Sequence, residues 1–208
     1  MDDFQQLANN LKLLKALDGR PLLGRLTNAY FVNRCLPESQ VEVFEQMYDI
    51  RLPEEYRRFI IEIGDGGAGP FSGILPLGRY FPLEDDPRLN RLNQPFPHRT
   101  SWSEDALSEE ELELYQSDRE YLNQLTQGAL IIQDFGCAIS VLLVVTGERR
   151  GSIWMDDTAN AGTITPMENG ESFLKWYSRW LDEVLKKAAD MCQISIESTN
   201  LPFLKGLA

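Results

Sequence analysis

The side chains that could do catalytic chemistry are few in this sequence and lie far apart. His98 is the single histidine, and no serine or cysteine motif stands near it that it could activate as a general base. We therefore predict a surface histidine. Asp134, Asp156 and Asp157 are the carboxylates that a small hydrolase could use. However, Asp156 and Asp157 are neighbours at the end of a predicted strand, so they point to opposite faces, and a turn or cap role is favoured over a metal site.

The cysteines do not have the spacing of a metal site. Cys35, Cys137 and Cys192 are odd in number, far apart and without a C-x-x-C pair. A structural zinc site needs four ligands that the chain can bring together, and one histidine adds little. The sequence therefore predicts free, reduced thiols packed as small core residues, and neither a metal nor a cofactor.

Two glycine motifs match nucleotide-binding signatures but stand in the wrong context. Residues 64–69 fit G-x-G-x-x-G, yet they follow a predicted helix, whereas a dinucleotide fingerprint leaves a strand and opens a helix. Residues 134–136 spell the Asp-Phe-Gly of protein kinases, but Thr100 stands where the catalytic aspartate should follow His-Arg. We predict a helix cap with a tight turn for the first motif and a turn between strands for the second.

Composition and charge restrict the partners. The 208 residues include 43% apolar and 25% charged residues, and 32 acids against 20 bases give a net charge of −12. Such a field repels nucleic acid and anionic membranes. It suits a basic protein partner, although acids that only keep the protein soluble are the alternative. The first residues carry no basic and apolar leader and no apolar run reaches membrane-spanning length, which predicts a cytoplasmic protein.

The elements that must position these residues are organised around residues 129–157. Residues 138–145 are dense in β-branched and apolar side chains, which predicts a central strand buried on both faces. The polar, glycine-bracketed residues 146–151 then connect it to a second apolar run at residues 153–155. This pattern predicts a β-hairpin.

Apolar residues at helical spacing predict helices around these strands. The first helix covers residues 4–17 and stops at the Gly-Arg-Pro of residues 19–21. Leu-Pro-Glu at residues 36–38 and 52–54 should open two more, because proline suits the first turn and the acids meet the positive end of the helix dipole. A helix at about residues 170–189 carries an aromatic-rich apolar stripe, which indicates core packing.

The most distinctive stretch is an acidic loop-helix insertion at residues 84–127, here called the acidic segment. Its part from Glu84 to Glu120 contains eleven acids and four arginines, which supply −7 of the net charge. Prolines keep its first half extended or looped, and a capping box at residues 108–111 predicts a helix to about Leu125.

We predict that this acidic segment binds the partner. Its acids would steer a basic protein towards it, and Trp102 could serve as an aromatic anchor. The predicted contacts are Trp102, Glu104, Asp105, Glu109, Glu110 and Glu113. The alternative is a solvated helix face with no partner.

Several different motifs follow one another along the chain in a characteristic order. They include Leu-Pro-Glu-Glu-Tyr at residues 52–56, the glycine-rich residues 64–70, Ile-Leu-Pro-Leu at residues 74–77, and the Phe-Leu-Lys-Trp-Tyr of residues 173–177. Together they resemble the SUKH superfamily, specifically its Smi/Knr-like branch. The resemblance covers a core at about residues 36–185. The helix at residues 1–20 and the tail at residues 190–208 lie outside it.

This resemblance implies a single α+β domain over residues 1–208, with a mixed, mostly antiparallel sheet flanked by helices. It also implies a non-catalytic, protein-binding role, because many bacterial members are immunity proteins that neutralise polymorphic toxins. The expected function is an immunity protein that binds a toxin domain with a basic surface. The alternatives are a regulatory scaffold of cell-envelope synthesis, as in fungal relatives, or a small hydrolase using Asp134, Asp156 or Asp157.

Overall fold

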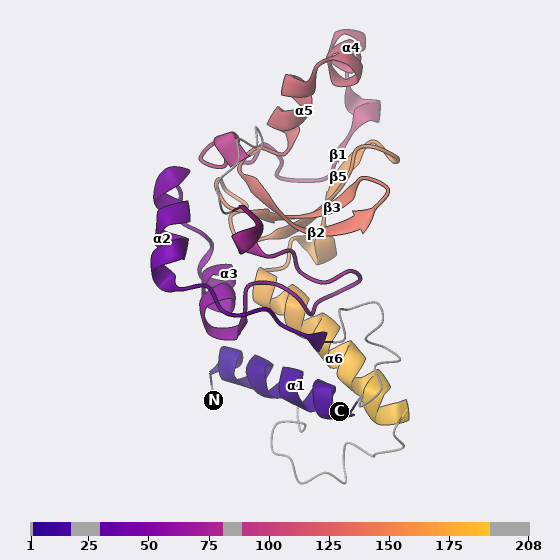
Figure 1. Cartoon of the computed structure of the whole chain (residues 1–208). Coiled ribbons are helices and arrows are strands. Elements are labelled where there is room, and N and C mark those ends of the chain that lie inside the picture. The colour runs from indigo at the N-terminus through magenta and orange to yellow at the C-terminus, as the bar shows by residue number, and fades with distance from the viewer. Residues whose placement is uncertain (1, 18–29, 81–88, 192–208) are drawn as a thin grey trace.

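Five strands form one sheet in the computed structural model, which describes residues 2–17, 30–80 and 89–191 (Figure 1). Every pairing between these strands is antiparallel. In order across the sheet, the strands are β1 (Trp102–Ser103), β5 (Thr163–Pro166), β4 (Ile153–Asp157), β3 (Ile139–Val144) and β2 (Ala129–Gly136). Strands β2 to β5 therefore form a meander, and the short β1 extends it at one edge. The predicted α+β class is confirmed.

Some predictions fall outside the described residues. These are the helix stop at residues 19–21, the first acids of the acidic segment at residues 84–86, and Cys192. The predicted tail lies there as well, except for its first two residues, which end the last helix at Met191.

Strand β3 is buried on both faces, as its sequence predicts. Val141, Leu142, Leu143 and Val144 are each fully inaccessible to solvent, although alternate residues of a strand face opposite sides. Val141 and Leu143 belong to a large core on one side of the sheet, whereas Leu142 and Val144 belong to a small core on the other. Pairing of Leu143 with Ile153 confirms the hairpin between β3 and β4.

The large core lies between the sheet and four helices. These helices are α1 (Asp3–Leu17), α2 (Glu38–Met47), α3 (Glu54–Arg58) and α6 (Phe173–Met191). Helix α1 packs on α6 (Figure 1), and the Arg58 guanidinium lies 4.1 Å from the centre of the Phe4 ring, which ties α1 to α3. The aromatic stripe of α6 joins this core through Phe173 and Tyr177, whose ring contacts include Phe59.

Proline opens two of these helices, as predicted. Pro37 is the N-cap of α2, and Pro53 is the N-cap of α3. Helix α3 continues into a π-helical turn (Phe59–Ile63), and Gly64 follows that turn as its C-cap. Further 3₁₀ turns are Leu77–Tyr80, Leu89–Arg91, Glu104–Ala106 and Met167–Asn169.

The glycine-rich segment shapes the backbone and leads from a helix into extended chain. Gly67 bridges Val32 on one side and Ile74 on the other, at φ 100°, a left-handed value that suits glycine. A Cβ atom at Gly67 would collide with the backbone around Phe31. The hydroxyl of Tyr177 donates a 2.7 Å hydrogen bond to the carbonyl of Ala68, so α6 locks the same segment in place. The observed backbone therefore agrees with the predicted helix cap and turn rather than with a nucleotide-binding loop.

The small core lies on the opposite side of the sheet, under the acidic segment. Its buried members are Phe96, Leu125, Ala129, Leu142, Val144, Trp154 and Ile164. The single helix predicted above it is in fact two, α4 (Glu109–Ser117) and α5 (Arg119–Leu125). Asp118 separates them because its backbone is extended, and its carboxylate caps α5 by accepting from the Glu120 N–H at 2.8 Å.

Candidate functional site

Helix α4 projects from the sheet as the outermost element on its side (Figure 1). The predicted capping box is present: Ser108 Oγ accepts from the Glu111 N–H, and the Glu111 carboxylate accepts from the Ser108 N–H at 2.9 Å. The Ser108 backbone N–H and the Ser108 hydroxyl both donate to the Glu111 carboxylate, and these two bonds hold the pKa of Glu111 below its ordinary value. No residue of α4 is buried, and Tyr115 anchors the helix by donating a 2.6 Å hydrogen bond to the Thr158 carbonyl.

Three of the predicted contact residues share the exposed surface of α4. Glu109 and Glu110 lie in its first turn, and Glu113 follows one turn later. Among the described residues, none of these three carboxylates forms a salt bridge. Leu114 on the same helix is 42% exposed, so an apolar side chain stands beside the acids. A charged and partly apolar surface of this kind is suited to a protein partner.

The other predicted contacts lie at the base of α4. Glu104 and Asp105 belong to the 3₁₀ turn after β1, where Ser103 Oγ accepts from the Asp105 N–H at 3.3 Å. The Glu104 N–H donates to the Gly162 carbonyl at 2.9 Å, which fixes this turn against the β4–β5 connection. The structure therefore places both acids next to the α4 surface.

Trp102 is half-buried and packs under α4. Its ring centre lies 5.7 Å from that of Tyr115 and 6.0 Å from that of His98. It also contacts the small core, so part of its area already stabilises the fold. Only the remaining part is available to anchor a partner.

His98 is buried, and its prediction as a surface residue is wrong. The side chain is 8% exposed, and Nε2 donates a 2.8 Å hydrogen bond to the carbonyl of Leu125. Its ring packs edge-on against Phe96 at 5.2 Å. Burial lowers the pKa of His98, although the Leu125 carbonyl and the Asp156 carboxylate oppose that shift. The neighbouring prolines suggested an exposed loop, so nothing in the sequence indicated that His98 holds the end of α5 against the small core.

This burial predicts a pH dependence of stability. The unfolded chain protonates His98 near its ordinary pKa of 6.5, but the folded chain protonates it only at lower pH. The folded state therefore loses stability as the pH falls below that value. In His98→Gln, an amide N–H can still reach the Leu125 carbonyl and nothing titrates.

Urea unfolding between about pH 7.5 and 5.5 measures this effect. The wild type should lose more free energy of unfolding than His98→Gln over that range. Parallel curves for the two proteins would show that His98 does not take part in the pH dependence.

The three candidate hydrolase carboxylates each accept a hydrogen bond from a group two or three residues further along the chain. Asp134 Oδ1 accepts from the Gly136 N–H at 2.7 Å, Asp156 Oδ1 accepts from the Thr158 N–H at 3.1 Å, and Asp157 Oδ1 accepts from Asn160 Nδ2 at 2.9 Å. The turn role predicted for the last two is confirmed. The predicted turn at residues 134–136 is wrong, because these residues end β2.

The tight turn that joins β2 to β3 is instead Cys137 and Ala138. Their φ values of 52° and 60° are typical of a two-residue hairpin turn. Cys137 is therefore exposed, as is Cys35, and both are free. The prediction that these cysteines are core residues is wrong, because one occupies a hairpin turn and the other a surface loop.

Metal independence remains a prediction. Within the described ranges, no three His, Cys, Asp or Glu side chains gather closely enough to hold a metal ion. We expect the melting temperature to stay the same when a chelator or a thiol reductant is added. A clear fall in the thermal unfolding midpoint with EDTA would reveal a site that these residues do not show.

Comparison with known families decides the classification. A model described as the SMI1 / KNR4 family (SUKH-1) matches residues 35–179, well over half of the chain. The chain belongs to the SUKH-1 family. Neither the search of curated proteins nor the search of solved structures gave a match. The SUKH-1 match confirms the resemblance, and it includes α4, β1 and the whole sheet but not α1.

One candidate site in this SUKH-1 chain was not predicted from the sequence. A polar pocket lies between α1 and α6, and its lining includes Asn10 and Asp182. Asn10 shares the buried face of α1 with Leu7, Leu11 and Leu14. A polar side chain at an apolar position of the helical repeat was the available signal.

None of the helices in the described part of the chain is long and apolar enough to span a membrane.

Proposed function

We propose that this SUKH-1 protein is a non-catalytic binding module, and specifically an immunity protein that neutralises a toxin domain with a basic surface. The observation that carries the proposal is the group of exposed carboxylates of Glu109, Glu110 and Glu113 on the projecting helix α4, which form no salt bridge among the described residues, in a chain whose net charge is −12. Membership of the SUKH-1 family supports the choice of a binding role over catalysis.

The binding surface in this proposal consists of α4 and its base. Its acids are Glu104, Asp105, Glu109, Glu110 and Glu113. The first-turn acids also lie at the positive end of the α4 dipole, so their negative charges on this surface do not destabilise the helix. Long-range attraction to a basic partner accelerates encounter, and the exposed area of Trp102 and Leu114 provides apolar contact once the two surfaces meet.

Co-expression tests this function directly. A toxin domain encoded beside the gene is expressed in a bacterial host with and without this protein, and survival is measured. We expect survival only with this protein, and co-elution of the pair in size-exclusion chromatography. A failure to protect the host, together with the absence of a complex, would overturn the immunity function.

A substrate panel tests the hydrolase alternative separately. The purified protein is assayed against esters, phosphoesters and peptides. We expect no turnover. Turnover that Asp156→Ala abolishes, with the fold intact by circular dichroism, would favour an enzyme instead.

A further inference from the structure

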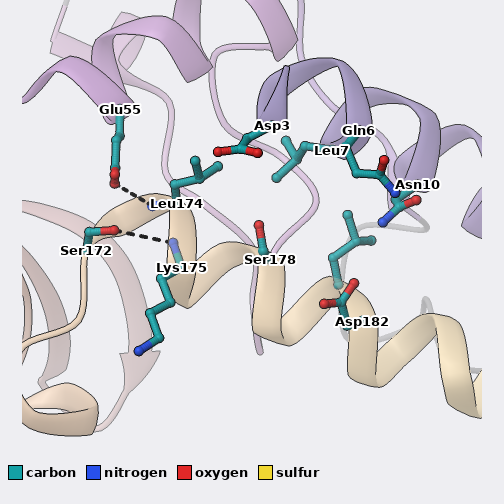
Figure 2. A pocket seen from close by; sticks show the side chains of 11 residues that line it. Asp3, Gln6, Leu7, Asn10, Glu55, Ser172, Leu174, Lys175, Ser178 and Asp182 are labelled. Carbon is teal, nitrogen blue, oxygen red and sulfur yellow. Dashed lines mark hydrogen bonds between the residues drawn. The ribbon is translucent and has the colours of Figure 1, made fainter. Parts of the chain in front are cut away.

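A polar pocket of 450 Å³ opens between α1, α3 and the first half of α6. Figure 2 shows Asp3, Gln6 and Asn10 of α1 and Ser178 and Asp182 of α6 around the same space. Its apolar lining residues are Leu7, Leu174 and Leu181, of which Leu7 and Leu181 are only 2% and 1% exposed. Helices α1 and α6, which line the pocket, lie at the end of the molecule away from α4 (Figure 1), so the pocket is separate from the proposed toxin-binding surface.

The charges of the lining are unbalanced. Its acids are Asp3, Glu55 and Asp182, against the single cation Lys175, whose ammonium group points away from the other side chains in Figure 2. The Glu55 carboxylate already has a structural role, because it accepts a hydrogen bond from the Leu174 N–H at 2.9 Å. Among the described residues, neither Asp3 nor Asp182 has an ion-pair partner. Asp182 is half-buried, and desolvation raises its pKa.

Asn10 gives a second and independent indication of a ligand. Its side chain is 6% exposed, and its Oδ1 has no hydrogen-bond partner among the described residues. A buried acceptor without a donor costs free energy and is rare in folded proteins. The oxygen is covered, but the terminal torsion of asparagine is broad, so the amide can turn the oxygen towards a donor in the pocket.

We propose that this pocket binds a cationic donor group, an alkylammonium or a guanidinium, carried by a lysine or arginine side chain or by a free amine. The Asp182 carboxylate is its charge partner, and Asp3 adds attraction at the mouth. An ammonium group has three N–H donors, which the Asp182 carboxylate, Asn10 Oδ1 and Ser178 Oγ can accept. The methylene stem lies against the apolar part of the lining, of which Leu174 is the most exposed member.

The pocket is a property of this chain beyond the family match. All of α1 and also Asp182 lie outside residues 35–179. The inference does not depend on toxin binding, because none of its residues belongs to the α4 surface. Each of the two proposals can therefore fail without the other.

The test is an NMR titration of the full chain with n-butylammonium and n-propylguanidinium, which are the lysine and arginine side chains cut at Cβ. We expect saturable shifts at the backbone amides of Gln6, Asn10, Ser178 and Asp182, with millimolar affinity. The neutral isostere n-butanol should leave these signals in place, because it offers no charge to Asp182. Absence of saturable shifts with both cations would overturn the proposal.

Matched variants make the result specific. Asp182→Asn is close to isosteric and should weaken binding at least tenfold, and Asn10→Leu should weaken it as well. Asp190→Asn, an exposed acid on the same helix, is the control and should bind like the wild type. Equal affinities for Asp182→Asn and Asp190→Asn would overturn the proposal even if Asn10→Leu fails to fold.

A second arm identifies the source of the cationic group. End-blocked tripeptides with a central lysine or arginine are titrated beside agmatine and cadaverine. Peptide binding at least as tight as that of the cut side chains assigns the pocket to a protein partner. Binding of the free amines alone assigns it to a small metabolite.

Discussion

Replacing Leu142 or Val144 with alanine is expected to lower the free energy of unfolding by about 2–4 kcal/mol for each variant. Both side chains are fully buried in the small core, where they pack with Trp154 and Ile164 on the α4 side of the sheet. Truncation removes apolar contacts and leaves a cavity that the neighbouring rings cannot fill without moving the strands. Urea unfolding followed by tryptophan fluorescence measures the change.

Leu143→Ala is the matched comparison, because Leu143 lies on the same strand but faces the large core. A loss of similar size in all three variants supports burial of β3 on both faces. Stability losses confined to Leu143→Ala would mean that the α4 side of the sheet is loosely packed. Unchanged midpoints in all of them would contradict the position of β3 in the fold.

The hairpin and the helix starts were predictable because they depend on local chemistry. A dense apolar run with a glycine-bracketed connection leaves few alternatives to β3 and β4, and proline favours the first turn at Pro37 and Pro53 for reasons that need no tertiary contact. The pairing of the two-residue β1 with β5 was not predictable. Such a short strand has no sequence period of its own, so only the sheet edge defines it.

The capping box of α4 was predictable for the same local reason, but the surroundings of the site were not. Asp118 interrupts the helical pattern by competing for a backbone N–H, so the predicted helix splits there. The burial of His98 and the packing of Trp102 arise from the small core, which brings together residues distant in sequence. Exposure of a polar or aromatic side chain in a proline-rich stretch is thus a tertiary property.

Reversing Glu109, Glu110 and Glu113 to lysine is expected to slow association with a basic toxin domain by on the order of tenfold or more. These acids are exposed and unpaired among the described residues, so they contribute to the field outside the protein without holding the fold together. Loss of the first-turn acids should cost the helix only a few tenths of a kcal/mol through its dipole. The capping box of Ser108 and Glu111 is left intact.

Stopped-flow kinetics at two salt concentrations measure the effect, and the salt dependence of the association rate should flatten in the variant. The matched control reverses Glu42, Glu54 and Asp190, which are exposed elsewhere on the molecule. Each reversal adds two positive charges, so both triple variants carry −6 in place of −12.

This design separates the position of the acids from the overall charge. If net charge alone steers the partner, both variants slow association equally. If the α4 surface is the docking site, its variant slows association much more, because attraction between exposed charges falls off within about 10 Å at ordinary salt. Unaltered association by the α4 variant, with full protection of the host, would place the interface elsewhere and leave α4 as a solvated helix.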